Sequence, residues 1–258
     1  MLFFGSDDMV EPHLIIFASV AAFFCAFFGS LVGGGGLIIV PLLLSLGLPI
    51  PVALGTRRFS SLGGTATGLI EFHRYKKMNY KLSFSLVVFA LVGSVLGYVV
   101  VDNLNESILR KMIGFLIVAL AIVLWFENKE RIKKLKGRLY KYRNAIGPPV
   151  AISSSLIAII VGGAGASVMT YLLIIVYGQT ILQSAGNRRL PLLAGNILAV
   201  ILFILAGYIH YPLAVPMLVA TAFGGYFGSR FYLQRGDEKV RVLFFGIMIL
   251  LGMKVLFL

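Results

Sequence analysis

The stretch Gly55-Thr56-Arg57-Arg58-Phe59 has a second version, Gly186-Asn187-Arg188-Arg189-Leu190, farther along the same chain. Both stretches lie within apolar sequence that has the character of membrane-spanning helix. Arginine is expensive in a hydrocarbon environment, and where it occurs it usually faces a cavity, a partner or a transport pathway. Two copies at matching positions therefore predict a duplicated membrane protein whose centre is cationic and binds an anion.

The arginine pairs belong to a longer internal repeat. Residues 52–80 align with residues 183–211 at an offset of 131. Upstream, Val32-Gly33-Gly34-Gly35-Gly36 matches Val161-Gly162-Gly163-Ala164-Gly165, with a gap of two residues between the aligned blocks. A repeat covering half the chain is the first property to interpret in a sequence. The identical positions of the longer block are Gly55/Gly186, Arg57/Arg188, Arg58/Arg189, Gly64/Gly195, Phe72/Phe203 and Tyr80/Tyr211.

The composition predicts a polytopic integral membrane protein. Of 258 residues, 59% are hydrophobic and 13% are charged, which is far more apolar than a soluble domain can expose. The net charge of +13 does not indicate a nucleic-acid partner, because most basic residues lie in short loops between apolar runs. The N-terminal Asp7, Asp8 and Glu11 argue against a cleavable signal peptide, so we expect the first apolar run to remain as a transmembrane helix.

Each half of the chain divides into five hydrophobic elements. The second element of each half has only about 13 residues, nearer half of a bilayer crossing than a full one. We expect a first transmembrane repeat at 1–126, a basic cytoplasmic linker at 127–147 and a second transmembrane repeat at 148–258. The elements run at about 13–33, 36–48, 52–72, 82–101 and 109–126 in the first half, and at about 148–162, 165–178, 183–206, 212–229 and 239–258 in the second.

The distribution of Lys and Arg predicts the orientation in the membrane. The segments 73–81, 127–147 and 230–239 are the most basic, and they fall on one side if every element reverses the direction of the chain. Lys and Arg are enriched in cytoplasmic loops, so both termini should lie outside. Each half then crosses an odd number of times, which makes the two repeats inverted relative to each other. Inverted repeats are typical of secondary transporters.

Glycine clusters precede both short elements and predict broken or re-entrant helices near the membrane midplane. Free backbone amides are tolerated at that depth only where they line a cavity, and there they can meet an anionic substrate. On this interpretation Gly34, Gly35 and Gly163 are substrate-binding residues. The alternative is that the clusters serve close helix packing, which is the interpretation we prefer for Gly93, Gly97, Gly224 and Gly228.

Arg57, Arg58, Arg188 and Arg189 are the main candidates for substrate binding. A guanidinium is permanently charged, and its planar fork of donors suits the oxygens of sulfite, sulfonate, sulfate or carboxylate. Adjacent residues on a helix point about 100° apart, so we expect one arginine of each pair to face the centre. The alternative is that all four anchor helix ends at the interface. Repetition in both halves favours the binding role.

Neutral polar residues near the arginines are further candidates. Thr56, Asn187 and Asn196 could complete the coordination of an oxyanion, and Asn196 is the strongest because amides are rare in apolar helices. Hydroxyl groups also commonly bond back to the helix backbone, and that alternative stays open for Thr56 and for the neighbouring Ser60, Ser61, Thr65 and Thr67.

Glu71 and His73 lie at the expected inner end of the third element. A carboxylate beside a histidine could take part in proton coupling. The alternative is an ordinary loop-edge pair beside Arg74, because the repeat-related position of Glu71 is Leu202. Enzyme, metal-site and phosphate-loop motifs are missing from the sequence, so we expect neither an enzyme nor a cofactor or bound metal.

The chain resembles the sulfite exporter TauE/SafE family of membrane permeases. The resemblance is carried by Gly33-Gly34-Gly35-Gly36, Pro41, Gly47, Ala53 and Gly55-Thr56, and it extends through the second repeat to the C-terminus. It implies an internally duplicated helical permease that exports sulfite, sulfonates, sulfoacetate, thiosulfate or related organic anions. It also implies coupling to an ion gradient rather than to ATP.

Together these observations predict a secondary transporter, in the cytoplasmic (inner) membrane of a prokaryote, that works by alternating access around an arginine-lined central site. Its expected partners are a small anionic substrate and the lipid bilayer. Two alternatives stay open: a passive anion channel, and a membrane partner protein that transports nothing.

Overall fold

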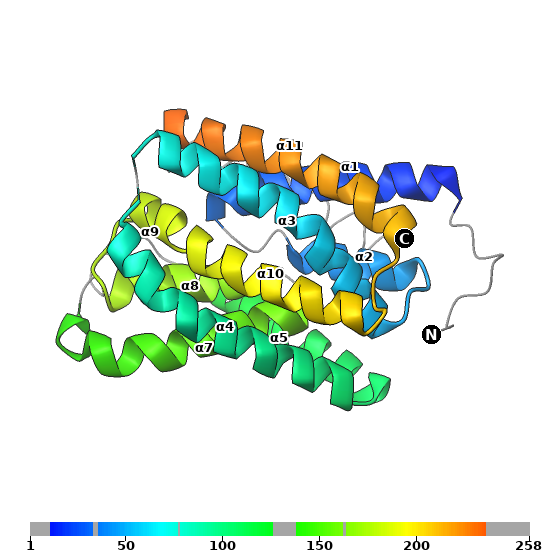
Figure 1. Ribbon diagram of the computed structural model, residues 1–258, viewed down its shortest axis with the longest axis horizontal. Coiled ribbons are helices and arrows are strands. Elements are labelled where there is room, and N and C mark those ends of the chain that lie inside the picture. Colours follow the sequence, from blue (N-terminus) through cyan, green and yellow to red (C-terminus); the bar gives the residue numbers. More distant parts are fainter. Residues whose placement is uncertain (1–10, 33–35, 77, 126–137, 162–163, 236–258) are drawn as a thin grey trace.

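The structure is a computed structural model that describes residues 11–32, 36–76, 78–125, 138–161 and 164–235 (Figure 1). These residues form helices joined by short connections, without any strand among them. Five of the helices are long and apolar enough to cross a membrane. The prediction of an all-α integral membrane protein is confirmed.

Every hydrophobic element expected within the described residues is helical. The two short elements contain 10 residues (α2) and 12 residues (α8), in agreement with their expected half length. The element expected at 239–258 and residues 127–137 of the linker lie outside the described residues. The helices are α1 (Pro12–Val32), α2 (Gly36–Ser45), α3 (Ile50–Arg74), α4 (Tyr80–Asn103), α5 (Glu106–Trp125), η1 (Tyr140–Tyr142), α7 (Arg143–Val161), α8 (Ala164–Ile175), α9 (Ile181–Asn187), α10 (Arg189–Leu205) and α11 (Tyr211–Arg235).

The element expected at 183–206 corresponds to one membrane span, Ile181–Leu205, with a local irregularity that the prediction did not include. It is interrupted at Arg188, which separates α9 from α10. Pro191 explains the interruption, because proline has no N–H to donate to the carbonyl four residues earlier and its ring clashes with that carbonyl. That carbonyl belongs to Asn187, the last residue of α9. The repeat-related residue in the first half is Ser60, and α3 is continuous there.

The helices of the two halves pack reciprocally. The first helix of each half lies against the fourth helix of the other, so α1 packs on α11 and α7 packs on α4. In the same way α3 packs on α11 and α10 packs on α4, and α3 meets α10 between them. Figure 1 shows α3 and α10 running in opposite directions along the long axis of the bundle. The contacts between the two halves are thus reciprocal, and their third elements run in opposite directions.

Glycines allow these contacts to be close, as predicted. A Cβ atom on Gly224 of α11 would overlap the Phe23 carbonyl of α1. A Cβ atom on Gly93 of α4 would likewise overlap the Ile152 carbonyl of α7. Small residues at such crossings let two helix backbones approach each other directly.

Two further contacts are related by the same offset of 131 and mark opposite ends of the bundle. The Thr56 hydroxyl accepts a hydrogen bond from the backbone N–H of His210 at 2.9 Å, just before α11. The Asn187 side chain accepts one from the backbone N–H of Asn79 at 2.5 Å, just before α4. We call these the His210 end and the Asn79 end of the bundle. In Figure 1 they lie at the right and at the left, respectively.

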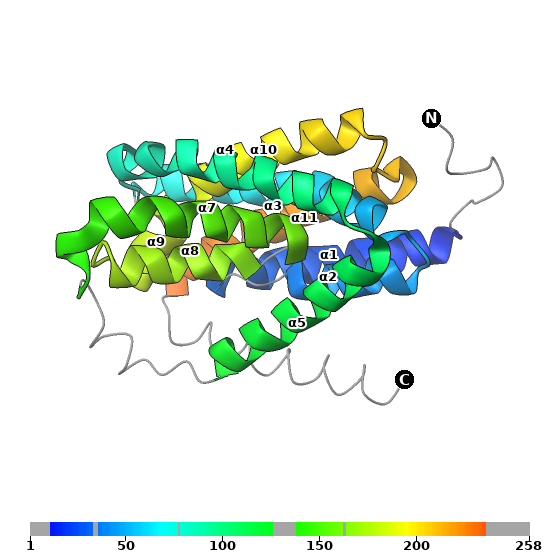
Figure 2. The same cartoon turned by 90° about the horizontal axis from the view of Figure 1, so that it is seen from below.

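The outer faces of the bundle suit a hydrocarbon environment. Along α4, the exposed side chains include Phe84, Val88, Val92, Val95 and Val99, which follow one face of the helix. Figure 2 shows α5 running obliquely away from the rest of the bundle. Glu106 at its start accepts a hydrogen bond from the Ile50 N–H at 3.0 Å and so ties α5 to the beginning of α3.

Candidate anion site

A cavity of about 140 Å³ lies between the two halves and is lined by α1, α2, α3, α4, α7, α8, α10 and α11. One buried water needs about 10–15 Å³ by the same kind of measure, so the space suffices for a small ligand with some hydration. All four repeated arginines line it: Arg57, Arg58, Arg188 and Arg189. The structure thus brings the four arginines, predicted separately in the two halves, to one cavity.

The expectation that only one arginine of each pair faces the centre was wrong. Arg58, Arg188 and Arg189 have exposed fractions of 7%, 3% and 6%, and Arg57 is half-buried. Arg188 lies between α9 and α10 with helical backbone angles (φ −69°, ψ −21°), and it reaches the same cavity as Arg189. In α3 the long side chains of Arg57 and Arg58 reach the same cavity from neighbouring directions on the helix.

The first arginine pair leaves several donors without partners. Arg58 Nη1 donates to Asn196 Oδ1 at 3.3 Å. Asn196 Nδ2 in turn donates to the Arg58 carbonyl at 3.3 Å and to Ser61 Oγ at 2.8 Å. Nε of Arg57 and both Nε and Nη2 of Arg58 are buried and find no hydrogen-bond acceptor among the described residues.

The second arginine pair is held more firmly by other helices. Arg188 donates to the Thr170 hydroxyl of α8 and, at 3.4 Å, to the Gly29 carbonyl of α1. Arg189 Nη2 donates to Ser229 Oγ of α11 at 2.9 Å and to the Ser30 carbonyl at 3.4 Å. Its guanidinium carbon also lies 4.7 Å from the centre of the Phe72 ring.

The charge in the cavity is not balanced by the residues that line it. Among the described lining residues there is no Asp or Glu. The ion pairs found in the described part of the chain, His13–Glu11 and Arg74–Glu71, involve none of the four cavity arginines. Burying a charged group with unsatisfied donors costs several kcal/mol of effective desolvation, whereas a bound anion supplies both the opposite charge and the acceptors. The arrangement is therefore suited to binding a small anion.

Several polar candidates have different surroundings. Thr56 and Asn187 do not line the cavity, and their side chains hold the segments before α11 and α4 instead. Asn196 does line it. Gly34, Gly35 and Gly163 lie outside the described residues. The hydroxyls of Ser60, Ser61, Thr65 and Thr67 all donate to carbonyls three or four residues earlier, and the first three of these residues also line the cavity.

Four polar lining residues were missed by the sequence interpretation, and Ser30 of α1 and Thr221 of α11 are two of them. Ser94 of α4 and Ser155 of α7 both line the cavity. The Ser155 hydroxyl is buried and has no hydrogen-bond partner among the described residues. The run Ser153-Ser154-Ser155 in an otherwise apolar helix was a signal that could have identified it.

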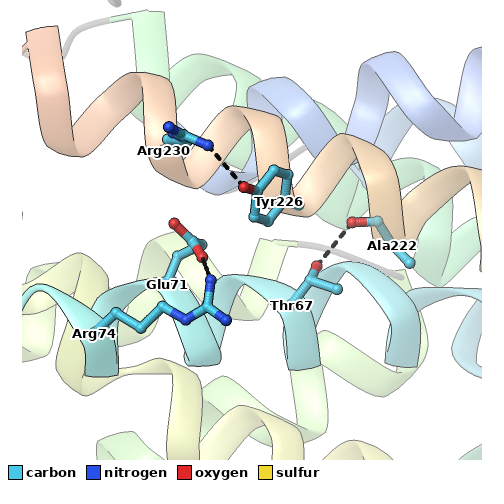
Figure 3. A network of polar contacts seen from close by, with 6 residues as sticks. All are labelled: Thr67, Glu71, Arg74, Ala222, Tyr226 and Arg230. Atoms are coloured by element: carbon cyan, nitrogen blue, oxygen red, sulfur yellow. Dashed lines mark hydrogen bonds and ion pairs between the residues drawn. The ribbon is translucent and has the colours of Figure 1, made fainter.

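Glu71 and His73 contact separate partners, and neither lines the cavity. Figure 3 shows the Glu71 side chain between α3 and α11, where it is 3% exposed and accepts a hydrogen bond from Arg74 at 3.0 Å. On the facing helix, Arg230 donates to the Tyr226 hydroxyl at 2.8 Å. His73 is exposed and contacts the Tyr80 hydroxyl.

Metal-binding chemistry has no support in the part of the chain that the structure describes. No group of three or more His, Cys, Asp or Glu side chains is close enough there to hold a metal ion.

Comparison with known proteins identifies the family. The model of the sulfite exporter TauE/SafE family matches residues 18–255. A probable membrane transporter protein of Haemophilus influenzae is 24% identical, over 91% of each chain. The probable membrane transporter protein YfcA of Escherichia coli K12 is 25% identical over 98% of this chain and 94% of its own. The probable membrane transporter protein YdhB of Bacillus subtilis is 28% identical over 77% and 82%. No solved structure matches. The resemblance seen in the sequence is confirmed, and the chain belongs to the sulfite exporter TauE/SafE family of membrane transporters.

Proposed function

We propose that this chain is a secondary transporter, with export as its direction, for small sulfur-containing anions such as sulfite, sulfonates and sulfoacetate. One observation carries the proposal: four arginines from both halves line one cavity whose described lining contains no carboxylate. Three of these residues, Arg57, Arg58 and Arg189, retain buried N–H groups that find no acceptor within the described segments. The name of the family, sulfite exporter, supports the choice of a sulfur oxyanion.

The mechanism we propose is alternating access by two inverted repeats. It is supported by the reciprocal packing of α1 on α11 and α7 on α4, and by the opposite directions of α3 and α10 (Figure 1). When two similar units are related in this way, exchanging their conformations converts a site open to one side into a site open to the other. The anion site lies between the units, where such an exchange would change its access.

We also propose that the Asn79 end faces the cytoplasm in the inner membrane of a prokaryote, with both termini outside. Basic residues gather at this end in the described segments, among them Arg74, Lys76 and Lys81. Cytoplasmic loops are enriched in Lys and Arg, which supports this orientation.

The chemistry of the cavity supports an anion with several oxygens. Guanidinium groups bind such anions with two parallel hydrogen bonds, and the neutral donors of Asn196 and Ser155 lie on the same cavity. A volume of about 140 Å³ suits a small inorganic anion or a short sulfonate better than a large organic one. Export of a dissociated sulfur oxyanion also requires shielding from the membrane interior, which a cationic cavity between the two halves of the protein provides.

The test is flux into liposomes that contain the purified protein. Uptake of sulfite, thiosulfate, sulfoacetate, sulfate and chloride is measured with and without a pH gradient. We expect saturable, gradient-driven uptake of sulfur oxyanions in preference to chloride. Equal leakage of all five anions would indicate a channel, and absence of flux for every anion would refute the proposal.

Variants connect flux to the cavity. Arg58→Gln should reduce transport efficiency by about tenfold or more, because hydrogen bonds to a charged group contribute about 1.5–3 kcal/mol. Lys81→Gln is the matched control, since it removes one positive charge at an exposed position at the start of α4. Glu71→Gln in the same assay tests whether the buried carboxylate takes part in coupling to the pH gradient. Unchanged flux in Arg58→Gln would contradict the arginine-lined site.

A further inference from the structure

The repeat-related arginines Arg58 and Arg189 do not have equivalent surroundings. Arg58 bonds across the cavity to Asn196 and retains two buried nitrogens that meet no acceptor in the part of the chain that the structure describes. Arg189 instead reaches toward the Asn79 end, where it bonds to Ser229 and lies over the Phe72 ring at 4.7 Å. Two residues that occupy the same place in the repeat thus adopt different roles in one conformation of the protein.

Arg189 sits on an apolar plug at the Asn79 end. Phe72 of α3 and Tyr232 of α11 are 0% and 2% exposed, and their ring centres are 6.3 Å apart. Phe28 of α1 and Ala185 of α9 complete the buried cluster, which we call the Phe72 plug. By joining α10 to α11, α1 and α3 at this level, the Arg189 side chain ties together the helices that would have to separate for this end to open.

The other end contains a buried aromatic pair of which one member is the repeat-related counterpart of Phe72, while the position equivalent to Tyr232 is Val101. Phe203 is equivalent to Phe72, and Tyr98 is equivalent to Ser229. Phe203 is fully buried, and its ring packs edge-on against Tyr98 with the ring centres 5.4 Å apart. We call this pair the Phe203 plug. A guanidinium placed over such rings gains a cation–π attraction, as Arg189 does over Phe72.

We infer that Arg58 and Arg189 exchange roles during transport: one serves as the ligand-facing cation in the cavity while the other locks the plug at its own end. In the conformation described here Arg189 locks the Phe72 plug and Arg58 faces the cavity. In the oppositely facing conformation Arg58 stacks on the Phe203 plug, and Arg189 turns into the cavity toward Thr65, the repeat-related counterpart of Asn196. This inference rests on the proposed alternating access, because it assigns the residues that switch between its two states.

The single cysteine gives a readout that needs no transported anion. Cys25 lines the cavity and is 8% exposed, so its modification by a reagent added from one side reports opening toward that side. The rate of reaction with a membrane-impermeant maleimide is measured in right-side-out and in inside-out vesicles. Phe72→Leu and Phe203→Leu weaken the two locks with little loss of apolar volume, and Phe223→Leu, at an exposed site on α11, is the control.

The two lock variants should shift accessibility in opposite directions. Phe72→Leu should increase labelling from the Asn79 end by roughly three- to tenfold and decrease it from the His210 end, because loss of the cation–π contact favours the conformation open at the Asn79 end. Phe203→Leu should do the reverse. Ser229→Ala removes only the hydrogen bond to Arg189, and it should change the labelling in the same direction as Phe72→Leu. Because this variant keeps the phenylalanine in place, it tests the lock even if the phenylalanine variants fold poorly.

The outcome separates this inference from the proposed function. The exchange of roles would be overturned if the labelling rate of Cys25 changed from one side of the membrane only. It would also be overturned if Phe72→Leu and Phe203→Leu shifted this rate in the same direction, even if anion flux is observed. Reciprocal shifts without flux of any sulfur oxyanion would support the exchange and refute the substrate assignment.

Discussion

Arg58 in the first half of the chain and Asn196 in the second half are joined across the cavity by a hydrogen bond of 3.3 Å between Arg58 Nη1 and Asn196 Oδ1. The Asn196 amide uses its two ends differently. Its oxygen accepts from the guanidinium, while its nitrogen donates to the Arg58 carbonyl and to the Ser61 hydroxyl. Asn196 therefore positions the Arg58 side chain without neutralising it, which leaves the charge available to a ligand.

Replacing this amide by a carboxylate should reduce anion affinity. Asn196→Asp places a negative charge next to Arg58, and an internal ion pair then competes with the substrate for the same guanidinium. We expect KM for sulfoacetate or sulfite to rise by about tenfold or more, since a charge-assisted pair of this kind contributes about 1.5–3 kcal/mol.

The control for this change is Asn103→Asp, because Asn103 is exposed at the end of α4. It adds the same charge away from the cavity and should leave KM unchanged. A value of KM for Asn196→Asp that equals that of the unmodified protein would show that the substrate does not use Arg58.

Thr56 should act on stability and not on substrate affinity. Its hydroxyl is fully buried and accepts the His210 N–H at 2.9 Å, so Thr56→Val keeps the shape and removes the acceptor. Loss of one buried partner costs about 1–3 kcal/mol, and we expect a lower unfolding midpoint in detergent with an unchanged KM. Thr65→Val provides the comparison for stability, since the Thr65 hydroxyl bonds only within its own helix among the contacts described. A raised KM with an unchanged midpoint in Thr56→Val would assign Thr56 to the substrate instead.

The sequence was sufficient to locate the centre of the protein because the repeat is visible in residue identities. Arg57/Arg188 and Arg58/Arg189 align at one offset, and a duplicated charge in apolar sequence indicates a common site. The short α2 and α8 could also be predicted, since their apolar runs are too short for a full crossing.

The surroundings of individual side chains could not be predicted in the same way. The partners of Thr56 and Asn187 are backbone N–H groups 154 and 108 positions away, and any residue type offers such a donor. The interruption at Arg188 depends on Pro191, whose effect was visible in principle, since a proline inside an apolar run breaks the hydrogen-bond ladder one turn earlier. The interruption does not explain why both arginines of a pair line the cavity, because Arg57 and Arg58 do so from the continuous helix α3.

The contact between α3 and α11 should depend on glycine. A Cβ atom on Gly225 of α11 would overlap the backbone of Gly64 in α3. Gly225→Ala should therefore lower the unfolding midpoint, with overpacking costing about 1–3 kcal/mol. Gly114→Ala is the matched control, because a Cβ atom on Gly114 meets nothing within 4 Å. At that exposed helical position alanine should be neutral or stabilising by up to about 1 kcal/mol. Equal effects of the two substitutions would mean that the helices are not in close contact at Gly225.

The positive charge of the cavity should be measurable through Cys25, which lines it together with Arg57 and Arg58. A cationic cavity concentrates anions and repels cations, so a negatively charged methanethiosulfonate should modify Cys25 faster than a positively charged one. For Cys25 we divide the rate with the negatively charged reagent by the rate with the positively charged one, and we divide this ratio by the same ratio measured for a reference thiol. We expect the result to be about ten or more. The reference is Asn103→Cys in a Cys25→Ser background, where the thiol is exposed at the end of α4.

Sulfoacetate at saturating concentration should then slow the reaction of Cys25 but not that of the reference, because it occupies the cavity without consuming the reagent. A faster reaction with the positively charged reagent would show that the four guanidiniums are neutralised by groups of the protein itself, and the cavity would then not be an anion site.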